Sequence, residues 1–210
     1  RAQDIETRYG CPVEFVKADL AEVADCRSVI ATAKARFGRI DALVNVAAIT
    51  DRGTILDTAP ALFDRMFAIN TRAPFFLMQD TIQLMIESGT QGTIVNISSM
   101  SSMAGQPFIA AYCASKGALD TLTRNTAFAL LKNRIRVNAL NIGWMASDGE
   151  DRIQREHHGA DADWLEKAAA RQPFGRLVDP AEVARLSFIA RVWPHDRRHH
   201  QFRPVDMGSL

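Results

Sequence analysis

Along the chain, short runs rich in β-branched residues alternate with longer stretches whose apolar residues recur every three or four positions. The short runs have the length and composition of buried strands, and the longer stretches have the period of amphipathic helices. The predicted strands are 13–18, 40–46, 92–98 and 134–140, and the predicted helices are 1–9, 21–37, 60–88 and 108–131. This alternation is typical of one α/β domain built on a parallel sheet.

The helix predicted over 108–131 carries the most informative chemistry. Tyr112 and Lys116 are four residues apart, so they share one helix face and the ammonium lies beside the phenol. A tyrosine that moves protons near neutrality needs its pKa lowered from about 10 to about 7. One lysine rarely supplies all of that, so the pair implies a second positive charge, such as an oxidised nicotinamide ring.

Ser99 ends the strand predicted at 92–98 and so places a hydroxyl at its carboxyl end, where open α/β sheets bind ligands. Each part has an ordinary alternative. A tyrosine and a lysine at this spacing are usually a surface pair, and serines after a strand are mostly turn or cap residues. The combination is more specific than either part, and it makes an oxidoreductase the first hypothesis.

These residues, and others in the same order along the chain, resemble the classical short-chain dehydrogenase/reductase family. The resemblance implies a Rossmann-like doubly wound parallel sheet and hydride transfer between NAD or NADP and an alcohol or ketone. A polar segment with His157, His158 and Asp161 suggests a sugar or polyol as substrate. The segments that carry the resemblance are Asp19-Leu20, Leu43–Ala48, Phe67–Asn70, Ser99 with Tyr112 and Lys116, Arg136–Gly143 and Pro173–Ala184.

The same resemblance implies the site residues. Tyr112 would exchange the proton with the substrate oxygen, Lys116 would lower the tyrosine pKa and hold the nicotinamide ribose, and Ser99 would hydrogen-bond the substrate oxygen. Asn70 would hold a water that links Lys116 to solvent, although from the residues alone it is a helix-kink residue just before Pro74. The implied cofactor contacts are Asp19, Leu20, Asn45, Ala47, Tyr112, Lys116, Ile142, Gly143 and Ser147.

Three positions bear on how closely the family pattern is kept. Val46 and Ala48 stand where the family has an asparagine and a glycine, which removes one side-chain hydrogen bond and adds a methyl group beside the cofactor. Ile142 replaces the usual proline, which leaves Gly143 to make the bend with less restraint. Ser147 keeps the hydroxyl of the family's threonine, which caps the next segment and contacts the nicotinamide amide.

The family begins with a strand, a glycine-rich turn and a helix that faces the cofactor pyrophosphate, and the sequence contains no such turn. We therefore expect a sheet missing the first two strands, with a slot beside the strand that ends at Asn45. The edges of such a slot expose unpaired backbone and apolar side chains. We expect this chain not to fold stably alone or to bind a dinucleotide normally.

The resemblance also stops near the other end, so the predicted division is a domain at 1–190 and an atypical basic tail at 191–210. We hypothesise a frameshift near residue 190, because codons for the tail can spell a family-like ending in the next reading frame. The alternative is an ordinary basic tail. His195, His199 and His200 raise the question of a metal, but Pro194 argues against a helix there and no metal site is predicted.

The net charge, the cysteines and the lengths of the apolar runs limit the classes of binding partner and the cellular compartment that we expect. The formal net charge of +1 gives no general attraction to nucleic acid or to a membrane. Cys11, Cys26 and Cys113 lack metal-ligand spacing and leave one unpaired, which favours a reducing cytoplasm. No apolar run reaches membrane-spanning length. The family resemblance implies a homo-oligomer, a dimer or tetramer, for the complete protein.

Two further classes of function stay open beside the oxidoreductase. One is a catalytically silent binding or scaffold protein, favoured by the altered turn and the absent glycine-rich segment. The other is an isomerase or dehydratase that uses the same tyrosine. The choice between NAD and NADP is not encoded in the residues present. Trp144, Met145 and Trp164 either line the substrate pocket or pack within the fold.

Overall fold

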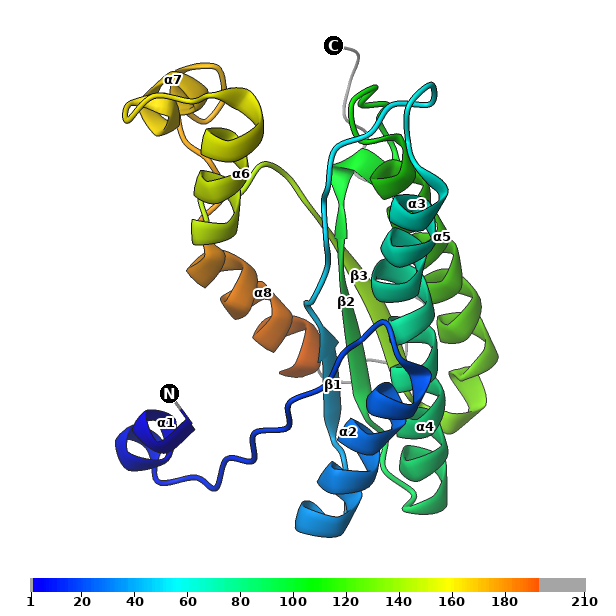
Figure 1. Cartoon of the computed structure of the whole chain (residues 1–210). Coiled ribbons are helices and arrows are strands. Elements are labelled where there is room, and N and C mark those ends of the chain that lie inside the picture. The colour runs from blue at the N-terminus through cyan, green and yellow to red at the C-terminus, as the bar shows by residue number, and fades with distance from the viewer. Residues whose placement is uncertain (1, 193–210) are drawn as a thin grey trace.

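The computed structural model describes residues 2–192 (Figure 1). The three histidines considered for a metal, and residues 193–210 of the predicted tail, lie outside the described residues. Within the described part, no helix is both long and apolar enough to cross a membrane.

The sheet is parallel, as predicted, and its strands follow one another in space as they do in the sequence. Strand β1 spans Ala42–Asn45, β2 spans Thr93–Ser99 and β3 spans Arg136–Ile142, in the order β1-β2-β3. Every residue of the central strand β2 is buried, which explains its continuous run of apolar and small residues. The register sets Ser99 beside Ile142, so β2 and β3 end together at one edge of the sheet.

Helices cover both faces of this sheet, which confirms the doubly wound class. In Figure 1, α3, α4 and α5 lie on one side of the strands with α2 packed on α4, and α8 lies on the other side against β2 and β3. The α-helices are α1 (Ala2–Tyr9), α2 (Val23–Phe37), α3 (Pro60–Phe67), α4 (Ala73–Glu87), α5 (Ala110–Ala129), α6 (Asp148–His158), α7 (Trp164–Ala170) and α8 (Pro180–Val192).

The helix predicted over 60–88 is one helical path with a distortion inside it. A five-residue π-helical turn, η1 (Ala68–Arg72), separates α3 from α4 and contains Asn70. Pro74 lies in the first turn of α4, where its missing N–H costs little. Single π turns inside helices are frequent at functional sites. The helix is therefore irregular just before Pro74, and the irregular turn contains a candidate site residue.

The strand predicted over 13–18 is wrong. This segment is extended but belongs to no sheet, and Phe15 is 77% exposed. Its backbone is held instead by local contacts such as Val13 N donating to Glu6 Oε1 at 2.6 Å. A strand needs a neighbour to accept its hydrogen bonds, and no described strand lies beside it. The ends of the other predicted elements lie within two residues of the observed ends, and some coincide with them.

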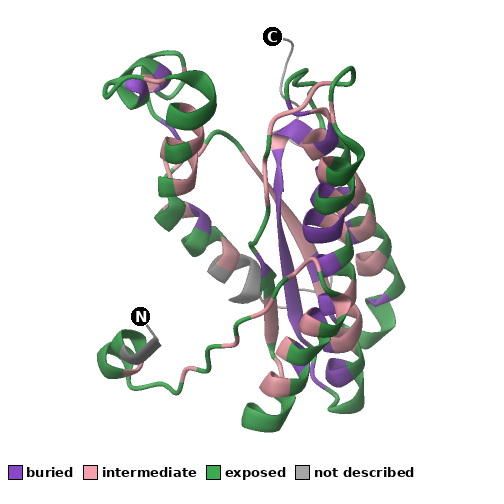
Figure 2. Cartoon of the chain, in the orientation of Figure 1, coloured by how far each residue is buried: buried purple, intermediate pink, exposed green. Residues whose placement is uncertain are grey.

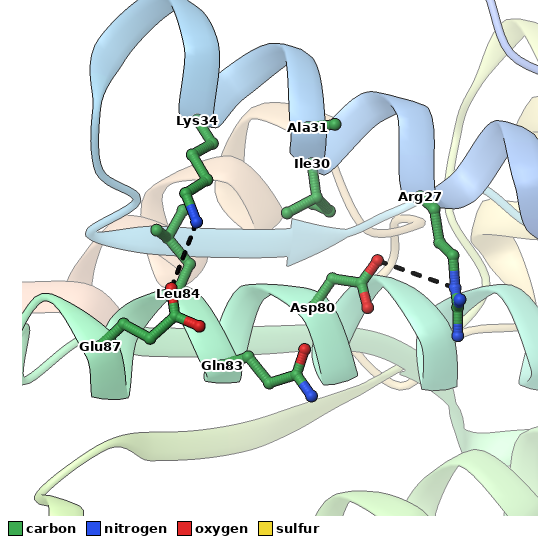
Figure 3. Close-up of a pocket in the computed structure, with 8 residues that line it drawn as sticks. All are labelled: Arg27, Ile30, Ala31, Lys34, Asp80, Gln83, Leu84 and Glu87. Atoms are coloured by element: carbon green, nitrogen blue, oxygen red, sulfur yellow. Dashed lines mark hydrogen bonds and ion pairs between the residues drawn. The ribbon is translucent and has the colours of Figure 1, made fainter.

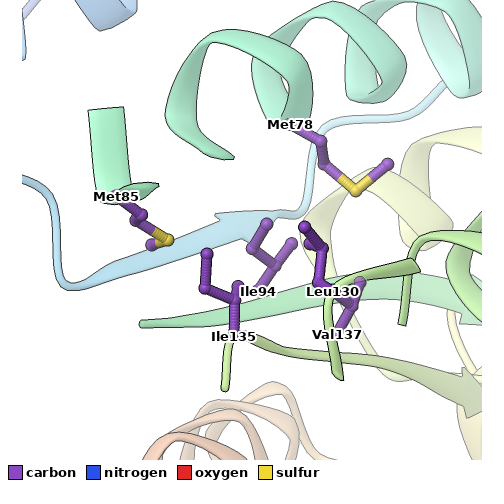
Figure 4. Close-up of a cluster of buried hydrophobic side chains, with 6 residues drawn as sticks. All are labelled: Met78, Met85, Ile94, Leu130, Ile135 and Val137. Atoms are coloured by element: carbon purple, nitrogen blue, oxygen red, sulfur yellow. The ribbon is translucent and has the colours of Figure 1, made fainter. Parts of the chain in front are cut away.

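Burial is concentrated in β2 and in the helix faces that meet it (Figure 2). The largest apolar cluster joins α4 to β2 and β3 (Figure 4), and its methionines fill the irregular space between helix and sheet. It consists of Met78, Met85, Ile94, Leu130, Ile135 and Val137. On the other face, Val95 and Ile97 of β2 pack against Val183 of α8. This two-sided packing fixes the strand that delivers Ser99.

A groove of about 250 Å³ runs between α2 and α4 (Figure 3). Lys34 Nζ and Glu87 Oε2 approach to 3.2 Å across it, and Arg27 pairs more loosely with Asp80 at 4.0 Å. Exposed pairs of this kind stabilise a fold by at most about 1 kcal/mol each. The groove contains none of the predicted site residues, so it is a helix-packing feature rather than part of the candidate site.

Candidate active site

Helix α5 places Tyr112 and Lys116 on one face, as their spacing predicts. The ammonium Nζ of Lys116 lies 5.8 Å from the centroid of the Tyr112 ring. Lys116 is only 3% exposed, and its Nζ donates to the Ile97 carbonyl of β2 at 2.7 Å. The lysine thus reaches from α5 to the strand that ends at Ser99, and it connects the helix half of the site to the sheet half.

Ser99 and Tyr112 meet at the end of β2. A hydrogen bond with Ser99 lowers the pKa of the Tyr112 phenol, but burial raises that pKa more strongly, so the balance lies above its ordinary value. Ser99 Oγ also accepts from Ser101 N at 3.1 Å and caps the short 3₁₀ turn η2 (Met100–Ser102). The two hydroxyls face one site from a strand and a helix, which suits them to hold one substrate oxygen.

Lys116 itself is strongly influenced by its surroundings. Burial lowers the pKa of its ammonium to about 8, and the negative charge of Asp120 acts in the opposite direction. A lysine with this pKa changes charge close to neutrality. Its ability to stabilise a neighbouring phenolate therefore depends on pH.

Asn70 is 1% exposed and fully engaged by its neighbours. Its Oδ1 accepts from Ile49 N, and its Nδ2 donates to the Ile49 carbonyl, both at 2.9 Å. Nδ2 also lies 3.1 Å from Ser115 Oγ, next to Lys116 in sequence. These contacts hold the π turn against α5 and against the segment after β1, and the water that the resemblance implies for Asn70 stays a prediction.

Three predicted cofactor contacts lie together beside β1. Leu20, Asn45 and Ala47 line a cavity of about 240 Å³ whose other walls are mostly aliphatic. Asn45 Nδ2 donates to Asn96 Oδ1 at 2.8 Å, which fixes the end of β1 against β2. Asp19 directly precedes Leu20 in the sequence, does not line this cavity, and accepts from Ala21 N at 2.9 Å. Apart from Asn45, the residues that line the cavity are apolar.

The remaining predicted cofactor contacts follow β3. Ile142 ends the strand next to Ser99, Gly143 comes directly after it, and Ser147 caps α6 by accepting from Glu150 N at 3.2 Å. The capping expected for Ser147 is therefore present. The structure thus brings Ile142 to Ser99, whereas Leu20 and Asn45 lie at the separate cavity by β1.

Trp164 and Met145 pack within the fold, whereas Trp144 is 37% exposed. Trp164 is buried with Ala168 and Leu177, and Met145 packs against the cluster that α8 forms with β2. Trp144 donates from Nε1 to Glu150 Oε1 at 2.7 Å. Packing describes the contacts of Trp164 and Met145, and lining of the substrate pocket stays a prediction for Trp144.

Sequence reasoning missed a contact between the segment after β1 and the end of α6. Arg52 lies over the Phe108 ring at 5.3 Å, and its guanidinium approaches His158 Nε2 at 2.9 and 3.1 Å. Backbone bonds between Gly53 and the residues at the start of α5 hold this segment close to Tyr112. The partners are 106 residues apart, so no local pattern could have revealed the contact.

A buried network around Asp120 was missed as well. Its carboxylate accepts from Ser102 Oγ and from Asn141 Nδ2. Asp120 follows Lys116 by four residues on an otherwise small and apolar helix face, and that spacing is the signal that could have identified it. Among the described residues, no group of three or more His, Cys, Asp or Glu side chains could hold a metal ion.

A doubly wound parallel sheet with a serine at the end of β2, and with a tyrosine and a lysine on the adjacent helix α5, is typical of an oxidoreductase of the Rossmann-like class. A family model described as enoyl-(acyl carrier protein) reductase matches residues 1–190. The chain belongs to the short-chain dehydrogenase/reductase family. Nicotinamide cofactors are the cofactors of this family's oxidoreductases.

Three relatives illustrate the range of this similarity. A galactitol 2-dehydrogenase of Agrobacterium fabrum is 33% identical over 100% of this chain and 83% of its own length. A sorbitol dehydrogenase of Cereibacter sphaeroides is 31% identical over 95% of this chain and 78% of its own. An inactive 2-(S)-hydroxypropyl-CoM dehydrogenase 2 of Xanthobacter autotrophicus is 32% identical over 90% of this chain and 81% of its own.

Proposed function

We propose that this protein oxidises a secondary hydroxyl of a sugar or polyol with NAD or NADP, and reduces the corresponding ketone in the reverse direction. The observation that carries the proposal is the position of Lys116, whose ammonium lies 5.8 Å from the Tyr112 ring centroid and donates to the Ile97 carbonyl of the strand that ends at Ser99. The names of two relatives, a galactitol and a sorbitol dehydrogenase, support the substrate class.

In this proposal the chain's own residues handle the proton and the substrate oxygen. Ser99 and Tyr112 hold the reacting hydroxyl between them, and Tyr112 takes its proton as the carbinol C–H bond breaks. A nicotinamide, when bound, accepts the hydride and carries a positive charge in its oxidised form. Lys116 stabilises the phenolate through its charge. Burial raises the pKa of Tyr112, so the site needs more positive charge than the lysine alone gives.

The residues present fit a nicotinamide cofactor at both of its ends. The aliphatic cavity beside β1 suits an adenine base, for which we assign Leu20, Asn45 and Ala47 as walls and Asp19, the residue before Leu20, as a polar contact. For the nicotinamide end we assign the residues at the ends of β2 and β3 and the start of α5. These are Tyr112, Lys116, Ile142, Gly143 and Ser147.

We further propose that the protein is cytoplasmic and forms a homo-oligomer. The cysteines Cys11, Cys26 and Cys113 are all free thiols, which suits a reducing compartment. Phe75 and Ile86 on α4 and Phe128 on α5 are exposed large apolar side chains, and such residues favour association when they gather on one surface. Sedimentation of the complete protein at several concentrations tests the oligomeric state.

The second candidate is a silent binding protein, and two observations favour it. The Tyr112 phenol has a raised pKa in its own surroundings, and one relative is named inactive. Such a protein would bind a dinucleotide or a polyol without turnover.

The discriminating experiment measures the absorbance of reduced nicotinamide with NAD or NADP and a panel of polyols that includes galactitol and sorbitol. In parallel, binding of each cofactor is measured by quenching of tryptophan fluorescence. In the complete protein we expect turnover of at least one polyol with one of the two cofactors, whereas residues 1–210 alone, which lack the glycine-rich turn, should bind either cofactor weakly. Cofactor binding by a folded protein with no turnover on any polyol or ketone would support the silent candidate instead.

A further inference from the structure

Asp120 is a buried carboxylate on the catalytic face of α5. It is 7% exposed and lies one turn beyond Lys116, so Tyr112, Lys116 and Asp120 follow one another at successive turns of one helix face. A charge withdrawn from water is costly unless it is paired and hydrogen-bonded. Its Oδ1 has no hydrogen-bond partner in the part of the chain that the structure describes. The fold therefore places this carboxylate where its burial is costly, and side-chain packing alone gives no reason for that position.

The other oxygen of this carboxylate joins three segments of the candidate site. Oδ2 accepts from Ser102 Oγ at 2.5 Å and from Asn141 Nδ2 at 2.7 Å. Asn141 Nδ2 also lies 2.9 Å from Ser102 Oγ and 3.3 Å from the Ser99 carbonyl. Ser102 belongs to the turn after Ser99, and Asn141 directly precedes Ile142 at the end of β3. Asp120 is thus the common acceptor for the turn that carries Ser99 and the strand end that leads to Gly143.

Asp120 is also the charged group that acts on Lys116. Lys116 lies beside the Tyr112 ring of α5 and donates to the Ile97 carbonyl of β2, and the negative charge of Asp120, one helical turn further along α5, raises the pKa of its ammonium. The partners of Asp120 from η2 and β3 are Ser102 and Asn141, and both side chains are neutral. The carboxylate therefore acts electrostatically on the lysine, and through hydrogen bonds on the two strand ends.

We propose that Asp120 is a positioning residue for the dehydrogenase reaction, and this inference rests on the proposed function. Asp120 keeps Lys116 protonated beside Tyr112, and it holds the turn after Ser99 against the end of β3. Asp120 touches neither substrate nor cofactor in this account. It acts through Lys116, Ser102 and Asn141. A purely structural network would stabilise the fold and leave the charge of Lys116 unchanged.

The first test measures the charge of Lys116 and needs no turnover. The sequence has five lysines, so the ε-carbon resonances of ¹³C-labelled lysine can be assigned and titrated. In Asp120→Asn, which keeps the shape and removes the charge, we expect the pKa of Lys116 to fall by about one unit. Thr123→Val is the matched control, since it loses buried hydrogen bonds on the same helix and should leave this titration in place. An unchanged Lys116 titration in Asp120→Asn overturns the proposal.

The second test measures steady-state kinetics over a range of pH. We expect Asp120→Asn to lower kcat by about tenfold or more with KM within about threefold, to change the shape of the pH profile, and Asp120→Glu to recover part of kcat. If Asp120→Asn does not fold, Ser102→Ala takes its place. It deletes one bond to the carboxylate but keeps the charge, so kcat falls while the Lys116 titration is retained. An unchanged kcat in a folded Asp120→Asn or Ser102→Ala overturns the proposal.

The two readouts separate failure of this inference from failure of the proposed function. A parent protein without turnover removes the proposed function, and the lysine titration then still decides whether Asp120 controls the charge of Lys116. A parent that turns over polyols, with an Asp120→Asn variant that matches it in kcat, pH profile and lysine titration, removes the inference and leaves the proposed function standing.

Discussion

Lys116 combines a catalytic assignment with an unfavourable position for a charge. It is buried, and burial lowers the pKa of its ammonium from 10.5 to about 8. The unfolded chain therefore holds the lysine proton up to a higher pH than the folded chain does. Folding is opposed by this residue below about pH 8, and the penalty disappears as pH rises from about 8 to about 10.5.

This linkage gives a stability prediction at the level of one residue. Between about pH 7 and pH 10, the free energy of unfolding of the parent should rise relative to that of Lys116→Met by about 2 to 3 kcal/mol, because only the parent loses a buried charge. Urea denaturation at a series of pH values measures the difference. Lys132→Met, at an exposed position, is the control and should follow the parent. Parallel curves for the parent and Lys116→Met would contradict the prediction.

The sequence revealed those site residues whose relation is local. Tyr112 and Lys116 are one helical turn apart, and Ser99 ends a strongly apolar run, so spacing alone placed them on a helix face and at a strand end. The partners of Asp120 come from a turn and a strand 18 and 21 residues away. Contacts of that kind depend on how β2, β3 and α5 pack, which no spacing rule predicts.

At the level of elements, the connection after β1 and helix α6 meet through Arg52, Phe108 and His158. The guanidinium stacks on the Phe108 ring and bonds the His158 imidazole, and Phe108 and His158 also lie edge to face at 6.0 Å. Phe108 directly precedes α5, which carries Tyr112. The contact therefore fixes α6 relative to α5, the helix that carries Tyr112.

Loss of this contact should affect substrate binding more than chemistry. We expect His158→Ala to raise KM for the polyol by about threefold to tenfold with kcat within about twofold, since a looser α6 weakens binding in ground state and transition state alike. Initial rates over a range of substrate concentrations measure both constants. His157→Ala, the neighbouring residue, is the matched control. A fall in kcat without a change in KM would show that His158 acts on the reaction step instead.

The misassigned strand at 13–18 and the π turn at 68–72 show where pattern reasoning fails for elements. Val13 to Lys17 have strand composition, but strand formation is decided by a hydrogen-bonding neighbour, which composition does not contain. The predicted helix over 60–88 was right in extent. The π turn inside it was not predictable in detail, because Asn70 is held there by Ile49 and Ser115 from other elements.

For the whole molecule, the edge of β1 that faces away from β2 matters most, because it decides whether the chain associates with other chains. Among the described strands, β1 pairs only with β2. Val44 is 43% exposed and Val46 63% exposed beside this edge. An unpaired edge next to apolar side chains favours association with another chain.

We therefore predict that residues 1–210, prepared as they stand, self-associate. Analytical ultracentrifugation over a range of concentrations should show species that grow with concentration, and Val44→Lys should shift them toward the monomer, because a charge at an edge opposes pairing. Ile55→Lys is the control, since Ile55 is also exposed but lies in the segment after β1, away from the strand. A single monomeric boundary at all concentrations would contradict this prediction.

The class of the fold was predictable because it rests on alternation repeated along the whole chain, and three predicted strands and their helices are present in parallel order. The adenine-end assignment was less predictable. Leu20 reaches the cavity beside β1 through a loop that Arg72 ties to the π turn, by donating to the Ala21 carbonyl at 2.6 Å. That placement depends on a tertiary contact rather than on the expected strand before Asp19.

The central claim is that Tyr112 moves the proton of a hydride-transfer reaction. It is tested most directly by comparing kcat for polyol oxidation in the parent, Tyr112→Phe and Tyr9→Phe. Tyr9 is the other of the two tyrosines in the sequence and is exposed, so its variant controls for loss of a phenol. Our account predicts that Tyr112→Phe lowers kcat by about 10³-fold while Tyr9→Phe matches the parent. Near-normal turnover in Tyr112→Phe would contradict it.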